Sequence, residues 1–172
     1  LEENLKACFR MAAQDVVCRT LAAQGEWVRA QWQEQRNQSG QQSLQAALAK
    51  AELATQSPEP YPDAWQTLAQ THLRLARGAG PAQRGQHIAQ GLEAVQKVFA
   101  LNPNHALGLA TQAELLLLRS QSERDPSTKQ QLAQAARQAL QSALAHDTLL
   151  SYAYESLLDS ARVLSAAAQN TK

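Results

Sequence analysis

The sequence has few of the residues that build β-sheets. Isoleucine and valine together number seven among 172 residues, and aromatic residues make up 5%. A strand needs β-branched and aromatic side chains to fill its pleated surface, so this scarcity argues against a sheet. Alanine (33 residues), leucine (25) and glutamine (24) instead make up nearly half of the chain. Because all three favour helices, the composition predicts an all-α fold.

Excess charge, long apolar runs and cysteine are also lacking. The chain has 16 Lys and Arg against 15 Asp and Glu, so no overall field attracts nucleic acid or anionic lipid. The longest clearly apolar run, Leu115 to Leu118, is far short of the ~20 residues that a membrane-spanning helix needs. We therefore expect no nucleic-acid partner and no membrane insertion. Two cysteines, Cys8 and Cys18, are too few for a disulfide framework, so we expect free thiols in a reducing, cytoplasmic compartment.

A pattern of apolar and small residues recurs about every 44 positions. Its large member stands at Leu21, Trp65, Leu109 and Tyr154, with gaps of 44, 44 and 45. Further apolar or small residues follow, mostly four and seven positions later, which places each set on one helix face. A second series, of small residues, has the same period and stands at Ala47, Gly91 and Ala136. Each unit therefore contains two helices, and units of this kind stack into a solenoid.

Proline, glycine and asparagine separate the helices, and Asp125 followed by Pro126 is a typical helix start. We predict helices at residues 3–13, 16–37, 41–55, 61–77, 83–101, 104–121, 127–146 and 148–168. The whole chain, 1–172, is expected to form a single repeat domain. It would begin with the second helix of a truncated repeat, at residues 1–15, and end with a terminal helix at residues 150–172. Three repeats lie between them, at residues 16–60, 61–104 and 105–149. The start at Leu1, without a signal-peptide pattern, indicates a piece of a larger protein, whereas the polar residues 169–172 fit a true C-terminus.

Two segments resemble the tetratricopeptide repeat family. Residues Asn102 to Ala106 read Asn-Pro-Asn-His-Ala, which is similar to the turn between repeats of this family, and Asp63 to Ala69 is similar to the start of its first helix. The resemblance covers about residues 17–168. It implies a right-handed superhelical solenoid of antiparallel helix pairs, although the units here are 44–45 residues long rather than about 34.

The elongated units, together with Arg124-Asp125-Pro126 before a second helix, resemble the C-terminal repeat regions of multidomain bacterial serine/threonine protein kinases. In that setting the repeats would be the regulatory or partner-binding part of a signalling protein. The chain itself contains no Gly-rich loop, no His-Arg-Asp stretch and no Asp-Phe-Gly, so the kinase domain is not within it.

The resemblance also implies that the first helices of the units line a concave groove. The residues that it places there are Arg19, Glu26, Arg29, Asp63, Gln66, Gln70, Arg74, Leu107, Glu114, Leu117, Tyr152, Glu155, Asp159 and Arg162. Arginines of this set would pair with acidic side chains of an extended or helical partner, and its leucines and Tyr152 would offer apolar contacts. The alternative is that these residues form only a polar helix face.

Individual side chains give no sign of chemistry. No nucleophile elbow, phosphate-binding loop or metal-ligand spacing is present, and His72 occupies a packing position of the repeat. Trp65 is expected in the core, and Trp32 either covers the neighbouring unit or contacts a partner. We therefore expect no catalytic residue, no cofactor and no metal.

The leading hypothesis is a non-catalytic protein–protein interaction module, a scaffold that binds a peptide or helix in its groove. The alternative is a regulatory or oligomerisation segment of a bacterial serine/threonine protein kinase, which would self-associate through open repeat ends. A sensor that binds a small ligand inside the superhelix is a third hypothesis.

Overall fold

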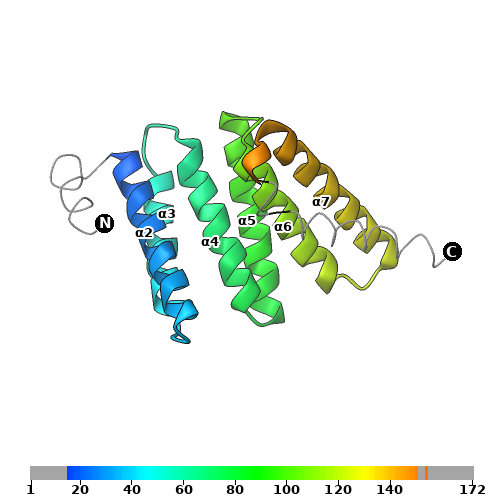
Figure 1. The fold of residues 1–172 in the computed structure, drawn as a ribbon, viewed down its shortest axis with the longest axis horizontal. Helices are drawn as coiled ribbons and strands as arrows, with labels where there is room; N and C mark the ends of the chain where they lie inside the picture. The colour runs from blue at the N-terminus through cyan, green and yellow to red at the C-terminus, as the bar shows by residue number, and fades with distance from the viewer. Residues whose placement is uncertain (1–14, 151–153, 155–172) are drawn as a thin grey trace.

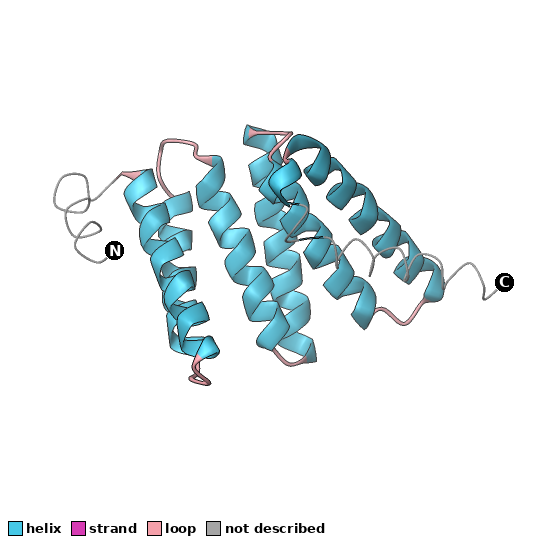
Figure 2. Ribbon diagram, viewed as in Figure 1, coloured by secondary structure: helices cyan, strands magenta, loops and turns pink. Residues whose placement is uncertain are grey.

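The computed structural model describes residues 15–150 and Tyr154, and within these residues it contains helices and no strand (Figure 2). The α-helices are α2 (Val16–Gln35), α3 (Gln41–Thr55), α4 (Pro62–Gly78), α5 (Pro81–Leu101), α6 (Ala106–Ser122) and α7 (Pro126–His146), followed by the 3₁₀ turn η1 (Thr148–Leu150). The all-α prediction is confirmed for this part of the chain. All six helices begin and end within two residues of their predicted bounds. The predicted helix 3–13 lies outside the described residues, as does most of 148–168.

Local signals explain where the helices start. The Asp15 carboxylate accepts a hydrogen bond from the Cys18 N–H at 2.9 Å and caps α2, and the Asp125 carboxylate caps α7. Pro62, Pro81 and Pro126 stand in the first turns of α4, α5 and α7. Proline is tolerated there because the first N–H groups of a helix have no partner within the helix.

The helices form three antiparallel pairs, α2–α3, α4–α5 and α6–α7, which stand side by side in a row (Figure 1). The pairs are joined in two ways. The second helix of one pair contacts the first helix of the next, and α2, α4 and α6 contact one another in order. Among the described helices, α3, α5 and α7 make no contact with each other. This arrangement agrees with stacked helix pairs, while the superhelical solenoid and the repeat boundaries stay predictions.

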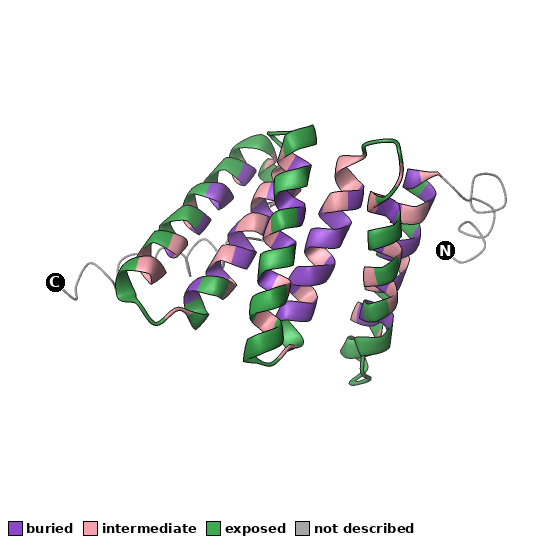
Figure 3. Ribbon diagram, turned by 180° about the vertical axis from the view of Figure 1, so that it is seen from behind, coloured by how far each residue is buried: buried purple, intermediate pink, exposed green. Residues whose placement is uncertain are grey.

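Small residues occur where helices approach most closely. Ala47, Gly91 and Ala136, the second predicted series, are all buried. A methyl group added at Gly91 would lie 3.0 Å from both terminal methyl groups of Leu115 on α6. Glycine at this position therefore permits α5 to pack against α6. Figure 3 shows buried residues alternating with exposed ones along the described helices, as amphipathic helices require.

The first unit departs from the predicted packing pattern. Leu21 and Val28 are 46% and 52% exposed. Trp65 and Leu109, which are equivalent to Leu21, are half-buried, and of the residues equivalent to Val28, His72 is buried and Leu116 is half-buried. The difference has a simple cause. In the later units the preceding helix, α3 or α5, packs against α4 or α6, and no described helix precedes α2.

Candidate functional site

A cavity of about 310 Å³ opens beside the row formed by α2, α4 and α6. It is lined by Trp27 from α2, by Gln70, Leu73, Arg74 and Arg77 from α4, by Glu114 from α6 and by Tyr154. Three of these, Gln70, Arg74 and Glu114, belong to the predicted groove. The cavity is therefore the place where the structure brings part of that set together.

Arg74 forms the wall between α2 and α4. Its guanidinium pairs with the carboxylate of Glu34 on α2. The same guanidinium lies 5.1 Å from the centre of the Trp27 ring, within the range of a cation–π contact. Because the Arg74 side chain is only 20% exposed, both contacts are partly shielded from solvent. Arg74 thus holds Trp27 in place at the edge of the cavity.

Arg77 and Glu114 form the opposite wall, between α4 and α6. The Arg77 guanidinium pairs with the buried Glu114 carboxylate, which also accepts a hydrogen bond from the Tyr154 hydroxyl. Burial raises the pKa of Glu114, and the positive charge of Arg77 acts in the opposite direction. Burial and the nearby Glu114 charge raise the pKa of Tyr154 to about 12. At neutral pH Tyr154 therefore remains protonated and is a hydrogen-bond donor.

Polar contacts between residues about one repeat apart join the row. The Gln24 amide donates to the Thr67 hydroxyl at 3.1 Å, which joins α2 to α4. The Gln66 amide donates to the Thr111 hydroxyl at 2.8 Å, which joins α4 to α6. Since Gln66, Thr67 and Thr111 are buried, these bonds satisfy the Gln66 amide N–H and the two threonine hydroxyls, while the Gln66 side-chain carbonyl oxygen has no partner among the described residues.

His105 joins the starts of α4 and α6. Its Nδ1 accepts a hydrogen bond from the Gly108 N–H at 3.0 Å and caps α6. Its Nε2 lies 3.0 Å from a carboxylate oxygen of Asp63. Because Nδ1 is an acceptor, the proton stands on Nε2 and is donated to Asp63. Asp63, a predicted groove residue, is thereby engaged within the chain.

The predicted groove residues differ widely in accessibility. Glu26, Gln66, Glu114 and Leu117 are buried, Arg19, Asp63, Gln70, Arg74 and Leu107 are half-buried, and Arg29 is exposed. The carboxylate of Glu26 pairs with both Arg29, at 3.4 Å, and Lys50, at 2.6 Å. Arg29 and Arg74 thus already contact carboxylates of the chain. The remaining four, Tyr152, Glu155, Asp159 and Arg162, lie outside the described residues.

Trp27 and Arg77 line the cavity but were not among the predicted groove residues. Arg77 lies three positions after Arg74, on the same face of α4, and this spacing is the signal that points to it. The indole N–H of Trp27 is buried and has no hydrogen-bond partner among the described residues. Trp32 is 48% exposed, and the Arg36 guanidinium lies 3.9 Å from the centre of its ring. Trp32 is therefore not covered by another described unit, and its contact with a partner stays a prediction.

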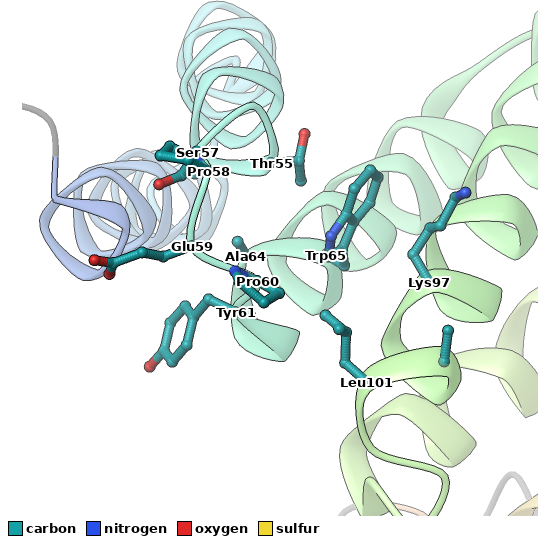
Figure 4. A pocket seen from close by; sticks show the side chains of 12 residues that line it. Thr55, Ser57, Pro58, Glu59, Pro60, Tyr61, Ala64, Trp65, Lys97 and Leu101 are labelled. Carbon is teal, nitrogen blue, oxygen red and sulfur yellow. The ribbon is translucent and has the colours of Figure 1, made fainter.

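A second hollow of about 300 Å³ lies between the α3–α4 loop and the end of α5 (Figure 4). Trp65 packs against the core cluster, as expected, and its ring also lines this hollow. Lys97 and Leu101 border it from α5, and Pro58 and Pro60 from the loop. Because the cavity beside α2, α4 and α6 also has an unpaired buried donor, it is the better candidate for a binding site.

Two histidines meet inside the α4–α5 pair. His72 is buried, as its position in the repeat predicted, and its Nδ1 lies 3.2 Å from Nδ1 of His87. Burial and the neighbouring His87 lower the pKa of His72 to about 4, and burial also lowers the pKa of His87. Two neutral rings with different tautomers satisfy this contact, since one donates and the other accepts.

Cys18 is disulfide-bonded. The prediction of free thiols is therefore wrong for this residue. Cys8, the other cysteine of the chain, lies outside the described residues.

Within residues 15–150 and Tyr154, no three His, Cys, Asp or Glu side chains are grouped so that they would hold a metal ion. None of the helices described there is long and apolar enough to cross a membrane. Comparison with protein-family models, with curated proteins and with solved structures finds no match to this chain.

Proposed function

We propose that this chain is a non-catalytic protein–protein interaction module. It holds a peptide or helix of a partner against the row of α2, α4 and α6, with one anchor side chain in the cavity beside Trp27. The observation that supports this most is the buried Trp27 indole N–H without a partner. A buried donor left unpaired costs about 1–3 kcal/mol, and a bound segment that turns the indole toward the cavity and offers it a backbone carbonyl would remove that cost.

The lining of the cavity defines the chemistry of the anchor. Trp27, Leu73 and the Tyr154 ring offer an apolar wall, so an aliphatic or aromatic anchor fits. Arg77 stands at the rim with a side chain that is 51% exposed. A guanidinium has five N–H donors, and its pairing with Glu114 leaves some of them for a partner. The preferred ligand therefore carries an apolar anchor next to an acidic residue.

The finer fold assignment is part of this proposal. The contacts along α2, α4 and α6 support stacked repeats of the tetratricopeptide type, which would wind into a right-handed superhelix. The elongated units of 44–45 residues and Arg124-Asp125-Pro126 are the basis for a place in a bacterial serine/threonine kinase. A cytoplasmic location belongs to the same proposal and requires that Cys18 be reduced there.

A second candidate is self-association through the ends of the row. Leu149, in the η1 turn after α7, is 81% exposed and favours this reading, because an exposed apolar side chain is a natural contact. Sedimentation over a range of concentrations tests it. A dimer that Leu149→Ser abolishes would support self-association, and a monomer at all concentrations would exclude it.

Selection of random displayed peptides tests the interaction module. Peptides chosen on the intact protein are titrated against wild type, Gln70→Trp and Trp27→Phe. Gln70→Trp fills the cavity and should weaken binding at least about tenfold, and Trp27→Phe, which removes the free donor, should weaken it several-fold. Gln96→Trp, at an exposed position of α5, is the control. Equal affinity for all variants would refute the cavity as the binding site.

A further inference from the structure

The hollow between the α3–α4 loop and the end of α5 is separate from the candidate cavity. Among the described residues, none lines both of them. Pro58 and Pro60 of the loop form one wall of the hollow, and Trp65 on α4 and Leu101 on α5 form others (Figure 4). A ligand bound there would leave the cavity beside Trp27 open, so the two sites can be tested independently.

The hollow has the size and the walls of a small-ligand site. Its volume of about 300 Å³ is at the lower end of the range for ligand pockets, about 300–1,000 Å³. Trp65 is half-buried and Leu101 is 39% exposed, so both present apolar surface that a ligand would remove from water. Aromatic rings also gain from packing against an indole. These features favour a ligand with one aromatic ring system.

Lys97 gives the hollow a positive charge. Its ammonium group forms no ion pair or hydrogen bond with the residues that the structure describes, whereas Lys50 on α3 pairs with Glu26 at 2.6 Å. Glu59 belongs to the loop wall, and Figure 4 shows its carboxylate directed away from Trp65 and Lys97. An uncompensated cation therefore stands beside the apolar wall.

We propose that this hollow binds a small aromatic carboxylate. The aromatic ring of the ligand packs between Trp65, Leu101 and the loop prolines, and its carboxylate pairs with the Lys97 ammonium. The site is distinct from the peptide site and does not depend on it. It would make the α3–α4 loop and α5 respond to a small metabolite, because the ligand contacts both.

The two kinds of contact contribute differently to affinity. Lys97 is exposed, and ion pairs at exposed positions are weak. A carboxylate should therefore bind only about two- to fivefold more tightly than a neutral amide with the same ring. The apolar contact is common to both compounds and supplies the larger part. For a ligand of the size of 2-naphthoate we expect a Kd of about 1 mM.

Nuclear magnetic resonance of the indole N–H groups tests the site. The chain has three tryptophans, and the signal lost in Trp65→Phe identifies that of Trp65. Titration with 2-naphthoate should shift the Trp65 signal saturably and leave those of Trp27 and Trp32 unchanged, and 2-naphthamide should do the same two- to fivefold more weakly. The proposal is overturned by no saturable shift at Trp65 at about ten times the expected Kd, or by a shift at Trp27 instead.

Variants then locate the two contacts. Lys97→Met should make the two probes bind equally, and Ala100→Trp, at an exposed position that lines the hollow, should weaken both at least about tenfold. Lys129→Met and Ala135→Trp, on α7, are the matched controls and should bind like wild type. Circular dichroism checks that each variant is folded, and Lys97→Met alone decides the charge contact if Ala100→Trp is not. A preference for the carboxylate that persists in Lys97→Met would refute the assignment.

Discussion

His72 and His87 face each other across the α4–α5 pair, with their Nδ1 atoms 3.2 Å apart. His72 is only 4% exposed, and burial followed by the neighbouring His87 lowers its pKa from 6.5 to about 4. The folded chain therefore resists binding a proton at this ring. The unfolded chain, in which the ring is solvated, accepts that proton near pH 6.5.

This difference makes stability depend on pH. Between pH 6.5 and 4 the unfolded state binds more protons at His72 than the folded state does, so the free energy of unfolding falls as the pH falls. At about 1.4 kcal/mol for each pH unit, the full loss at His72 is about 3 kcal/mol. A domain of this size is typically stable by about 5–15 kcal/mol, so the effect is large enough to measure.

Urea unfolding followed by circular dichroism, from pH 7.5 to 4.0, measures this dependence. The test variant is His72→Asn, because the asparagine amide reaches the position of Nδ1 and does not titrate. Any packing or helix-propensity cost of the variant is independent of pH and cancels in the slope. We expect the variant to lose about 3 kcal/mol less than wild type over this range.

His146→Asn is the matched control, since His146 is exposed at the end of α7. Its stability should fall with pH about as steeply as that of wild type. If the His72→Asn and wild-type curves run parallel between pH 7.5 and 4.0, the burial argument for His72 is wrong.

Two further predictions concern packing and charge. Gly91→Ala should destabilise the fold by about 1–3 kcal/mol, because the new methyl group would lie 3.0 Å from Leu115. Gly85→Ala on the same helix meets open space and should stabilise the fold by about 0.5–1 kcal/mol. Thermal unfolding distinguishes the two variants, and an equal effect of both would contradict the close packing at Gly91. Arg77→Met should cost about 1–3 kcal/mol, because the buried Glu114 carboxylate loses its cation. Adding Glu114→Gln should recover most of that loss in urea unfolding, and simple additivity of the two changes would show that the pair is not coupled.

The helices could be predicted closely because their signals are local. Asp125 followed by Pro126 marks the start of α7, and the apolar period distinguishes each helix from its neighbouring loops. The burial of His72 also followed from the repeat. The exposure of Leu21 and Val28 could not be predicted in this way, since the period places them in a packing position and their burial depends on what lies before α2.

The candidate site was harder to predict for a geometric reason. Repeat spacing aligns residues 44 apart, but Arg77 meets Glu114, which is 37 positions later. The pairing depends on how α4 and α6 cross, and that angle cannot be read from the spacing. The same limit applies to Trp27, whose free indole N–H is evident only once its neighbours are in place.

The way in which the helices contact one another has a mechanical consequence. The units are joined along α2, α4 and α6 and also where α3 packs against α4 and α5 against α6, while the described outer helices α3, α5 and α7 do not contact one another. A change in the curvature of the array must therefore shift the α3–α4 and α5–α6 contacts, which limit how far the outer edge can spread. A segment bound beside Trp27 would add contacts along α2, α4 and α6 and would stiffen that edge of the array.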